Sequence, residues 1–139
     1  MSMQDVANRW MTEVWQQGRL ESVDELHTED FVDHSPSGRA SDRDSYKAGI
    51  AGLYSAFPDF YAVTDDLVVD QPAKKIVVRW TASGTHQGEF MGIQATGQKI
   101  TFRGIEILRI AGDRIAERWG EWDGLDILEQ LRSGIGEKE

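Results

Sequence analysis

The stretch that decides the fold is residues 99–122, KITFRGIEILRIAGDRIAERWGEW, in which two runs of strand-forming residues flank the turn Ala111-Gly112-Asp113. Apolar and polar residues alternate on both sides of the turn, which is the spacing of strands with two unlike faces. Two strands joined by so short a turn pair antiparallel. The sequence therefore predicts a hairpin of two strands, over residues 99–110 and 114–122.

One face of the first strand carries a single charge, Glu106. The other residues of that face are apolar or small: Ile100, Phe102, Gly104, Leu108 and Ile110. An unpaired carboxylate there costs several kcal/mol of desolvation, so we expect the pKa of Glu106 to be raised. Two interpretations stay open. Glu106 is a cavity-lining acid or base, or it is a carboxylate paired with Arg118 or Arg79 or turned outward by a bulge.

The second strand ends in an acidic segment, in which Glu117, Trp119, Glu121 and Asp123 share one face. If Trp119 is the direct partner of Glu106, this face and Glu106 form one concave patch, and a slip of one residue separates them. We expect Glu117 on the surface or paired with an arginine, and Glu121 in solvent. Asp123 stands at a strand-to-helix corner. There it either faces a cavity as an acid/base or caps the helix from Gly124.

Working outward, apolar residues at helical spacing precede the strands, and the chain ends in a short helical pattern. The order of helices followed by an antiparallel meander is typical of an α+β fold, with helices against one face of a curved sheet. We expect one domain over residues 1–131 and a tail over 132–139. The expected helices are a first one between Asp5 and Gly18, then 20–26 and 41–57, and the remaining strands are 30–34, 61–69 and 75–85.

The composition limits the classes of partner that the protein is expected to bind. The 139 residues carry a formal charge of −9 without a Lys/Arg cluster, which argues against nucleic acid or an anionic membrane. The chain has no cysteine, so disulfides and thiolate chemistry are excluded. No signal peptide or membrane-length apolar run is visible, and we expect a cytoplasmic location.

The three histidines lack the spacing of a metal site, so no metal or cofactor is expected. We expect His27 on the surface at the end of the second helix. His34 and His86 are either structural histidines or proton carriers. Between His86 and Gln98, glycines alternate with apolar residues, which predicts a loop that folds back over something.

Five motifs stand in the same order as in SnoaL-like polyketide (ester) cyclases, and the resemblance covers nearly the whole chain. They are Phe31-Val32-Asp33-His34-Ser35-Pro36, Ala56-Phe57-Pro58-Asp59, Gly84-Thr85-His86-Gln87-Gly88-Glu89-Phe90-Met91-Gly92, Thr96-Gly97, and Glu117-x-Trp119-x-x-x-Asp123 followed by Leu128-Glu129-Gln130-Leu131. The resemblance implies an NTF2-like α+β cone, a homodimer through the sheet and a deep pocket. It also implies intramolecular aldol chemistry without a cofactor, with Asp123 as the acid/base.

The sequence thus predicts an enzyme that acts on an apolar, carbonyl-bearing small molecule such as a polyketide ester. Asp123 removes and returns a proton, and His34, His86 or Glu106 orients the substrate or stabilises an enolate. The expected substrate-binding residues are Tyr54, Trp80, Phe90, Met91, Trp119 and Trp122. Alternatives are an epoxide hydrolase or isomerase on the same fold, or a non-catalytic protein that binds an apolar ligand. At least two mutually bonded polar groups around Asp123 favour an enzyme, and an Asp123 that only caps the helix above a dry apolar cavity favours a binder.

Overall fold

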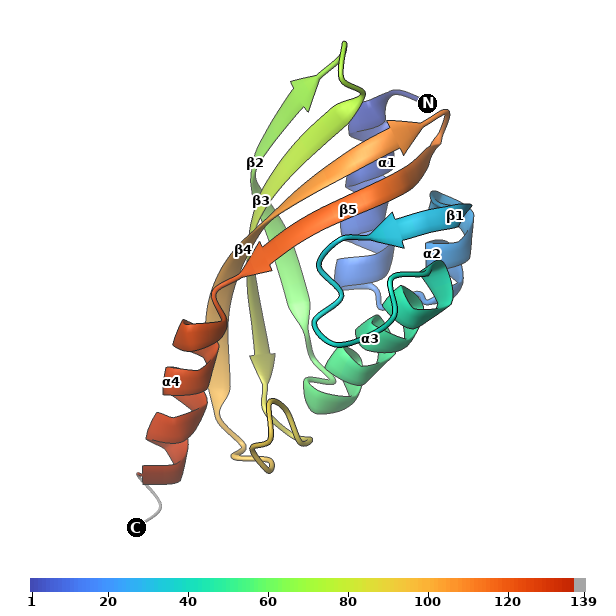
Figure 1. The fold of residues 1–139 in the computed structure, drawn as a ribbon. Helices are drawn as coiled ribbons and strands as arrows, with labels where there is room; N and C mark the ends of the chain where they lie inside the picture. Colours follow the sequence, from blue (N-terminus) through green and yellow to red (C-terminus); the bar gives the residue numbers. More distant parts are fainter. Residues whose placement is uncertain (137–139) are drawn as a thin grey trace.

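The computed structural model describes residues 1–136 and has the expected α+β architecture (Figure 1). Its sheet has five strands in the order β1-β5-β4-β3-β2. β1 pairs with β5 in parallel, and the other neighbours are antiparallel. The elements are α1 (Met3–Arg9), η1 (Trp10–Gln16), α2 (Glu21–Leu26), β1 (His27–Asp33), α3 (Arg43–Ala56), β2 (Tyr61–Asp70), β3 (Lys75–Thr85), β4 (Lys99–Ala111), β5 (Arg114–Trp122) and α4 (Gly124–Gly136).

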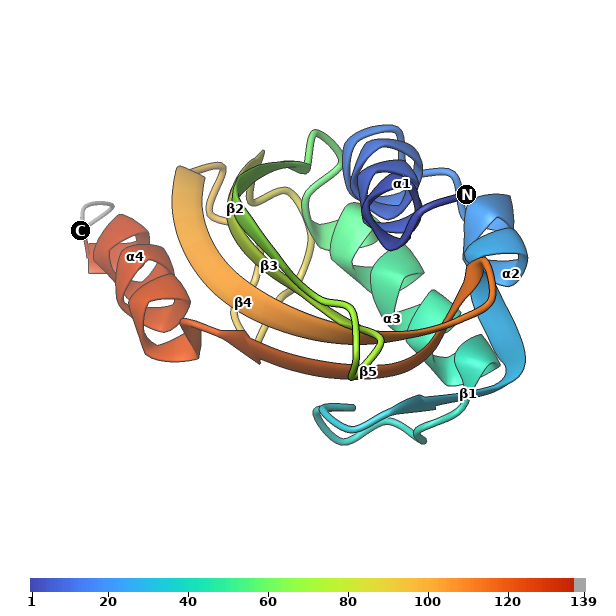
Figure 2. The ribbon, with the colours of Figure 1, turned by 90° about the horizontal axis from the view of Figure 1, so that it is seen from above.

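The sheet curves around the helices that precede it in the sequence. Figure 2 shows α1 and α3 on the concave side, with α4 beyond the end of the sheet. The Gln130 side chain ties α4 to β4 by two hydrogen bonds with the backbone of Thr101. The expected curved sheet with N-terminal helices against one face is therefore confirmed.

The concave face of the sheet forms one side of the core, as the alternation predicts. The inward residues of β3 are buried, and so is the whole predicted inner face of β4, Glu106 included. Burial of these large apolar side chains against α1, η1 and α3 is the main force that holds the layers together. The outer face is mixed, with Val68, Val77, Ile107 and Trp119 in one row across four strands.

A bulge in β5 sets the register of the hairpin and excludes a direct pairing of Glu106 with Trp119. Arg109 pairs with Glu117 while Ile110 pairs with Ile115, so Ala116 is an extra residue. Beyond the bulge, Glu106 pairs with Gly120 rather than with Trp119. Trp119 consequently lies on the outer face of the sheet with Glu117, and the side chain that turns inward toward Glu106 is that of Arg118.

Several boundaries differ from the sequence expectation, and two of these differences are the largest. β1 begins at His27, whose ring is buried against Phe31 and Tyr46, so the expected surface position of His27 is wrong. Packing of an edge strand against α3 decides this, and no local pattern reports it. At the other end, α4 continues through residues 132–136, which were expected to be tail, and residues 137–139 lie outside the described part.

Candidate functional site

Two cavities lie on the concave side of the sheet. The larger has a volume of about 660 Å³ and is bordered by α3, the loop after β1, the loop after β3, the end of β5 and the start of α4. The smaller is a void of about 10 Å³ beside Glu106, with walls made mainly of aromatic side chains. Trp15 and Trp122 border both spaces. These two indoles therefore form a partition between the void and the larger cavity.

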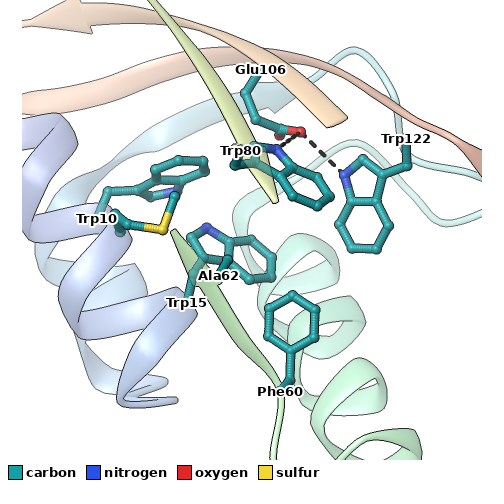
Figure 3. Close-up of a pocket in the computed structure, with 8 residues that line it drawn as sticks. Trp10, Trp15, Phe60, Ala62, Trp80, Glu106 and Trp122 are labelled. Carbon is teal, nitrogen blue, oxygen red and sulfur yellow. Dashed lines mark hydrogen bonds between the residues drawn. The ribbon is translucent and has the colours of Figure 1, made fainter. Parts of the chain in front are cut away.

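Glu106 lies at the wall of the small void and is held by three donors. Arg118 Nε lies 2.5 Å from Oε1, and the indole Nε1 atoms of Trp80 and Trp122 lie 3.2 and 3.1 Å from Oε2 (Figure 3). Burial raises the pKa of the Glu106 carboxyl, while Arg118 and the two indoles act in the opposite direction. Because every partner donates, the contacts satisfy the ionised carboxylate.

Arg118 extends this contact into a chain of alternating charges. Burial opposes its charged form, yet Glu106, Tyr46 and Asp33 raise the pKa of Arg118 above its ordinary value. Arg118 Nη1 donates to Asp33 at 2.7 Å, and the same carboxylate pairs with Arg39 at 3.5 Å. The order Glu106, Arg118, Asp33, Arg39 thus runs from the small void to the larger cavity.

Sequence reasoning missed Asp33 and Arg39. The signal for Asp33 was available, since it shares the inner face of its strand with Phe31 and both are buried. Arg39 gives no such signal. It lies in the loop between β1 and α3, and only the folding of that loop over α3 brings it to the cavity.

Asp123 is the cap of α4. Its Oδ1 accepts a hydrogen bond from the backbone N–H of Asp126 at 3.1 Å, and Asp123 is exposed to solvent. It is not among the residues that border either cavity. The structure therefore corrects the expectation that Asp123 faces the cavity, and the helix-capping alternative describes its position. The physical reason is the register of β5, which gives residue 123 the outer parity.

His34 lies at the border of the larger cavity, but its ring is on the outer face of the sheet, where it is coupled to a carboxylate. Its Nε2 lies 2.7 Å from Glu117 Oε2, and its ring stacks on Trp119 with centroids 4.6 Å apart and planes 7° from parallel. Glu117 also pairs with Arg109, and these hydrogen bonds from His34 and Arg109 lower the pKa of Glu117. With Nε2 directed to Glu117, Nδ1 is the ring nitrogen left for other partners.

His86 is buried and closes the base of the loop over residues 87–97. Its Nδ1 accepts a hydrogen bond from the Thr96 N–H at 3.2 Å and lies 3.0 Å from Thr96 Oγ1. The loop tip carries Phe90, which packs on Phe57, and Met91, whose φ of 52° is unusual for a residue with a side chain. The loop therefore covers the larger cavity, as expected, and His86 supports it from outside the lining.

The expected substrate-binding residues divide among three places. Phe90, Met91 and Trp122 border the larger cavity, and Trp80 and Trp122 border the small void. Trp119 lies on the outer face of the sheet, and Tyr54 instead donates to the Val14 carbonyl at 2.7 Å. For these two residues the expected place in the cavity is wrong, because the bulge turns Trp119 outward and η1 holds the Tyr54 hydroxyl.

Within residues 1–136, no three His, Asp or Glu side chains gather in the manner of a metal site. In the same range, none of the helices has the length and apolarity needed to cross a membrane. What the cavity does offer is hydrogen-bond donors and acceptors of fixed position beside a broad apolar surface.

The sequence pattern of the SnoaL-like polyketide cyclases matches residues 5–131. The chain belongs to this family. A solved structure with the same fold is an assigned polyketide cyclase from Acidithiobacillus ferrooxidans, at 26% identity and a TM-score of 0.82, covering 96% of this chain and 99% of that one. Another is IdmH from Streptomyces antibioticus, also an assigned polyketide cyclase. It is 27% identical with a TM-score of 0.82, and the match covers 95% of this chain and 99% of that one.

Family membership supports a cyclase-type role and leaves the reaction open. AclR from Streptomyces galilaeus, an assigned hydroxylase, is similar at 28% identity and a TM-score of 0.80, covering 95% of this chain and 98% of that one. One fold thus carries more than one assigned activity. No curated protein sequence matches this chain.

Proposed function

We propose that this protein is a cofactor-independent cyclase that performs intramolecular aldol chemistry on an apolar, carbonyl-bearing small molecule such as a polyketide ester. The observation that carries the proposal is the cavity of about 660 Å³. Its volume lies in the range of small-molecule sites, and polar residues face an apolar wall across it. The polar side includes Ser35, Arg39 and Arg118, and the apolar wall includes Ile50, Leu53, Phe90 and Met91.

In the proposed reaction, the substrate carbon next to a carbonyl lies at the border of the cavity, where Nδ1 of His34 takes a proton from it. The C–H electron pair forms a carbon–carbon double bond, and the carbonyl oxygen becomes an enolate oxygen. The enolate carbon then attacks a second carbonyl of the same molecule, which closes the ring. The new alkoxide takes the proton back from His34, so the product is an isomer of the substrate.

The surrounding charges support this assignment. Glu117 holds the imidazole by Nε2 and stabilises the imidazolium that forms. Glu106, which the sequence offered as a second acid or base, holds Arg118 from behind at the wall of the small void. Asp123 remains the rival base, since the family resemblance implies it and its position at the cap does not.

The proposal is tested by following α-deuterium exchange of β-tetralone, an apolar enolisable ketone, in D₂O by NMR. We expect exchange above the buffer rate, and a loss of about 10²-fold or more in His34→Gln, because a positioned base contributes about 10²–10⁴-fold. Asp123→Asn keeps a capping side chain and is expected to exchange within about twofold of the parent.

Two results would overturn the assignment. Loss of exchange in Asp123→Asn with full activity in His34→Gln would make Asp123 the base. Exchange at the buffer rate for the parent protein, together with binding of the ketone, would favour a non-catalytic ligand-binding protein.

We further propose that the protein forms a homodimer through the outer face of the sheet. That face exposes Tyr61, Val63, Val68 and Ile105, at 42–59% of their full surface. Such side chains on β2 and β4, on either side of β3, form a surface that a second copy can cover. A monomer mass in sedimentation equilibrium at micromolar concentration would count against this. The cytoplasmic location expected from the sequence stays a prediction.

A further inference from the structure

Gly120 leaves the guanidinium of Arg118 open to the larger cavity. A Cβ at position 120 would lie 2.7 Å from both Arg118 Cζ and Glu106 Oε1, and closer still to Arg118 Nη2. The guanidinium thus lies directly over the Gly120 backbone. Both residues border the larger cavity, although Arg118 is only 5% exposed. The absence of a side chain at position 120 therefore makes room for this guanidinium at the cavity border.

The hydrogen bonds of Arg118 use two of its three side-chain nitrogen atoms. Nε donates to Glu106, and Nη1 donates to Asp33 and, at 3.4 Å, to the Ser35 carbonyl. Within the described residues 1–136, Nη2 has no hydrogen-bond acceptor. This nitrogen occupies the position that a Cβ of residue 120 would take. Since the other two nitrogens are anchored, Nη2 is a donor of fixed position.

Arg39 brings a second guanidinium to the same cavity by a similar device. A Cβ at Gly49 of α3 would lie 2.6 Å from Arg39 Cζ and Nε, so Arg39 lies flat against the helix at that glycine. In the described part of the chain, the only polar contact of its guanidinium is the 3.5 Å pair with Asp33. Most of its five N–H donors therefore remain available to a molecule in the cavity.

The charges around these donors balance. Asp33, whose side chain is fully buried, lies between Arg118 and Arg39, and Glu106 lies behind Arg118. Two cations thus face two anions, and Glu121 adds a negative charge at the cavity border. Because the wall carries no net positive charge, a preference for a negative oxygen depends on the oriented N–H donors. A neutral carbonyl oxygen that becomes negative during a reaction fits such a wall, because the donors are already oriented.

We propose that Arg118 Nη2 and Arg39 form an oxyanion site that binds the oxygen of an enolisable carbonyl compound or phenol as that oxygen becomes negative. This rests on the proposed function, in which the larger cavity holds the substrate. It adds the two residues that bind the enolate oxygen, and it assigns Gly120 and Gly49 the role of making room for both guanidinium groups.

The test uses para-nitrophenol, whose phenolate is yellow and whose neutral form is not. Absorbance titrations against pH, with and without protein, give the affinities of the two forms. We expect the parent protein to bind the phenolate about tenfold more tightly than the neutral phenol, because a hydrogen bond to a charged oxygen is stronger than one to a neutral oxygen.

Two variants test whether Arg39 and Arg118 cause the preference for the phenolate. Arg39→Met removes one donor group, and Gly120→Ala puts a methyl group where Nη2 of Arg118 lies, which displaces the guanidinium while keeping every charge. Each is expected to reduce the preference to about threefold or less. The matched controls are Arg103→Met, on the exposed outer side of β4, and Gly52→Ala, where an added Cβ meets nothing within 4 Å. Both controls are expected to keep the preference of the parent.

Three results would overturn the oxyanion site: no binding of the dye, equal affinity for both forms, or a preference that Arg39→Met and Gly120→Ala leave unchanged. The outcomes of this binding test and of the deuterium-exchange assay can be told apart. Phenolate preference without ketone exchange would overturn the cyclase proposal alone, whereas exchange without phenolate preference would overturn the oxyanion site alone.

Discussion

The β4–β5 hairpin carries two Arg–Glu pairs that look alike in the sequence and differ in the fold. Arg118 pairs with Glu106, and Arg109 pairs with Glu117, each with an N–O distance of 2.5 Å. The first pair lies on the inner face, with side chains 6% and 2% exposed, and the second lies on the outer face, at 38% and 24%. The same two residue types across the same two strands therefore experience different dielectric surroundings.

The difference shows that an ion pair takes its role from its surroundings. The outer pair is screened by water, and pairs of this kind contribute about 0–1 kcal/mol. The inner pair has lost its hydration, so each charge depends on its partner, on the two indoles and on Asp33. Removal of one member leaves the others buried without compensation. The outer pair mainly orients His34 through Glu117, whereas the inner pair holds the wall of the cavity together.

The largest expected effect separates the two pairs by stability. Arg118→Met leaves Glu106 and Asp33 without their cation, and we expect it to lower the free energy of unfolding by about 3–5 kcal/mol. Arg109→Met, the matched change on the outer face, should cost about 1 kcal/mol or less. Urea unfolding of the two variants measures the difference. Similar losses for both would mean that burial does not separate the pairs.

A smaller effect concerns the protonation of His27. It tests whether the buried region around Arg118 disfavours a further charge. Burial lowers the pKa of His27 to about 4, and Arg43 and Arg118 act in the same direction. Since the unfolded chain keeps the ordinary pKa of 6.5, it binds more protons than the folded chain between these values. The contribution of His27 to stability is complete above about pH 6.5 and falls as the pH drops toward 4.

By this sign, the free energy of unfolding should be about 2 kcal/mol lower at about pH 5 than at about pH 7 because of His27 alone. Other groups titrate in the same window, so the comparison is made with His27→Gln, which cannot take up the proton. The fall between the two pH values should be about 2 kcal/mol smaller in that variant. An equal fall in both proteins would show that His27 is not held neutral.

The smallest effect concerns Asp123, an exposed carboxylate whose partner is a helix end. Asp123→Ala should lower the free energy of unfolding by about 1 kcal/mol, because the N–H of Asp126 loses its acceptor. Asp123→Asn should cost only a few tenths of a kcal/mol. Thermal unfolding of both variants checks this order. A loss of stability in Asp123→Asn well above a few tenths of a kcal/mol would show that the charge of Asp123, and not its capping hydrogen bond, stabilises the helix end.

Sequence patterns predicted the elements and the inner faces well. The strands over 75–85 and 114–122 have the predicted bounds, and the inner face of β4 was predicted residue by residue, with Glu106 paired to Arg118 as one of two open interpretations. Alternation reports such faces because burial acts on every second residue of a strand. The bulge at Ala116 was not predicted, and it moved Trp119 out of the expected concave patch.

The sequence by itself determined the α+β order of elements, the family and the presence of a carboxylate on an apolar face. Only the tertiary structure decided which acids meet a cavity: Asp123 became a cap, Glu106 became the partner of Arg118, and Asp33 and Arg39 joined them. The reason is physical. Local periodicity records which side of an element is buried, whereas contacts between residues 33, 39, 106 and 118 depend on strand register and loop packing, which no short stretch of chain encodes.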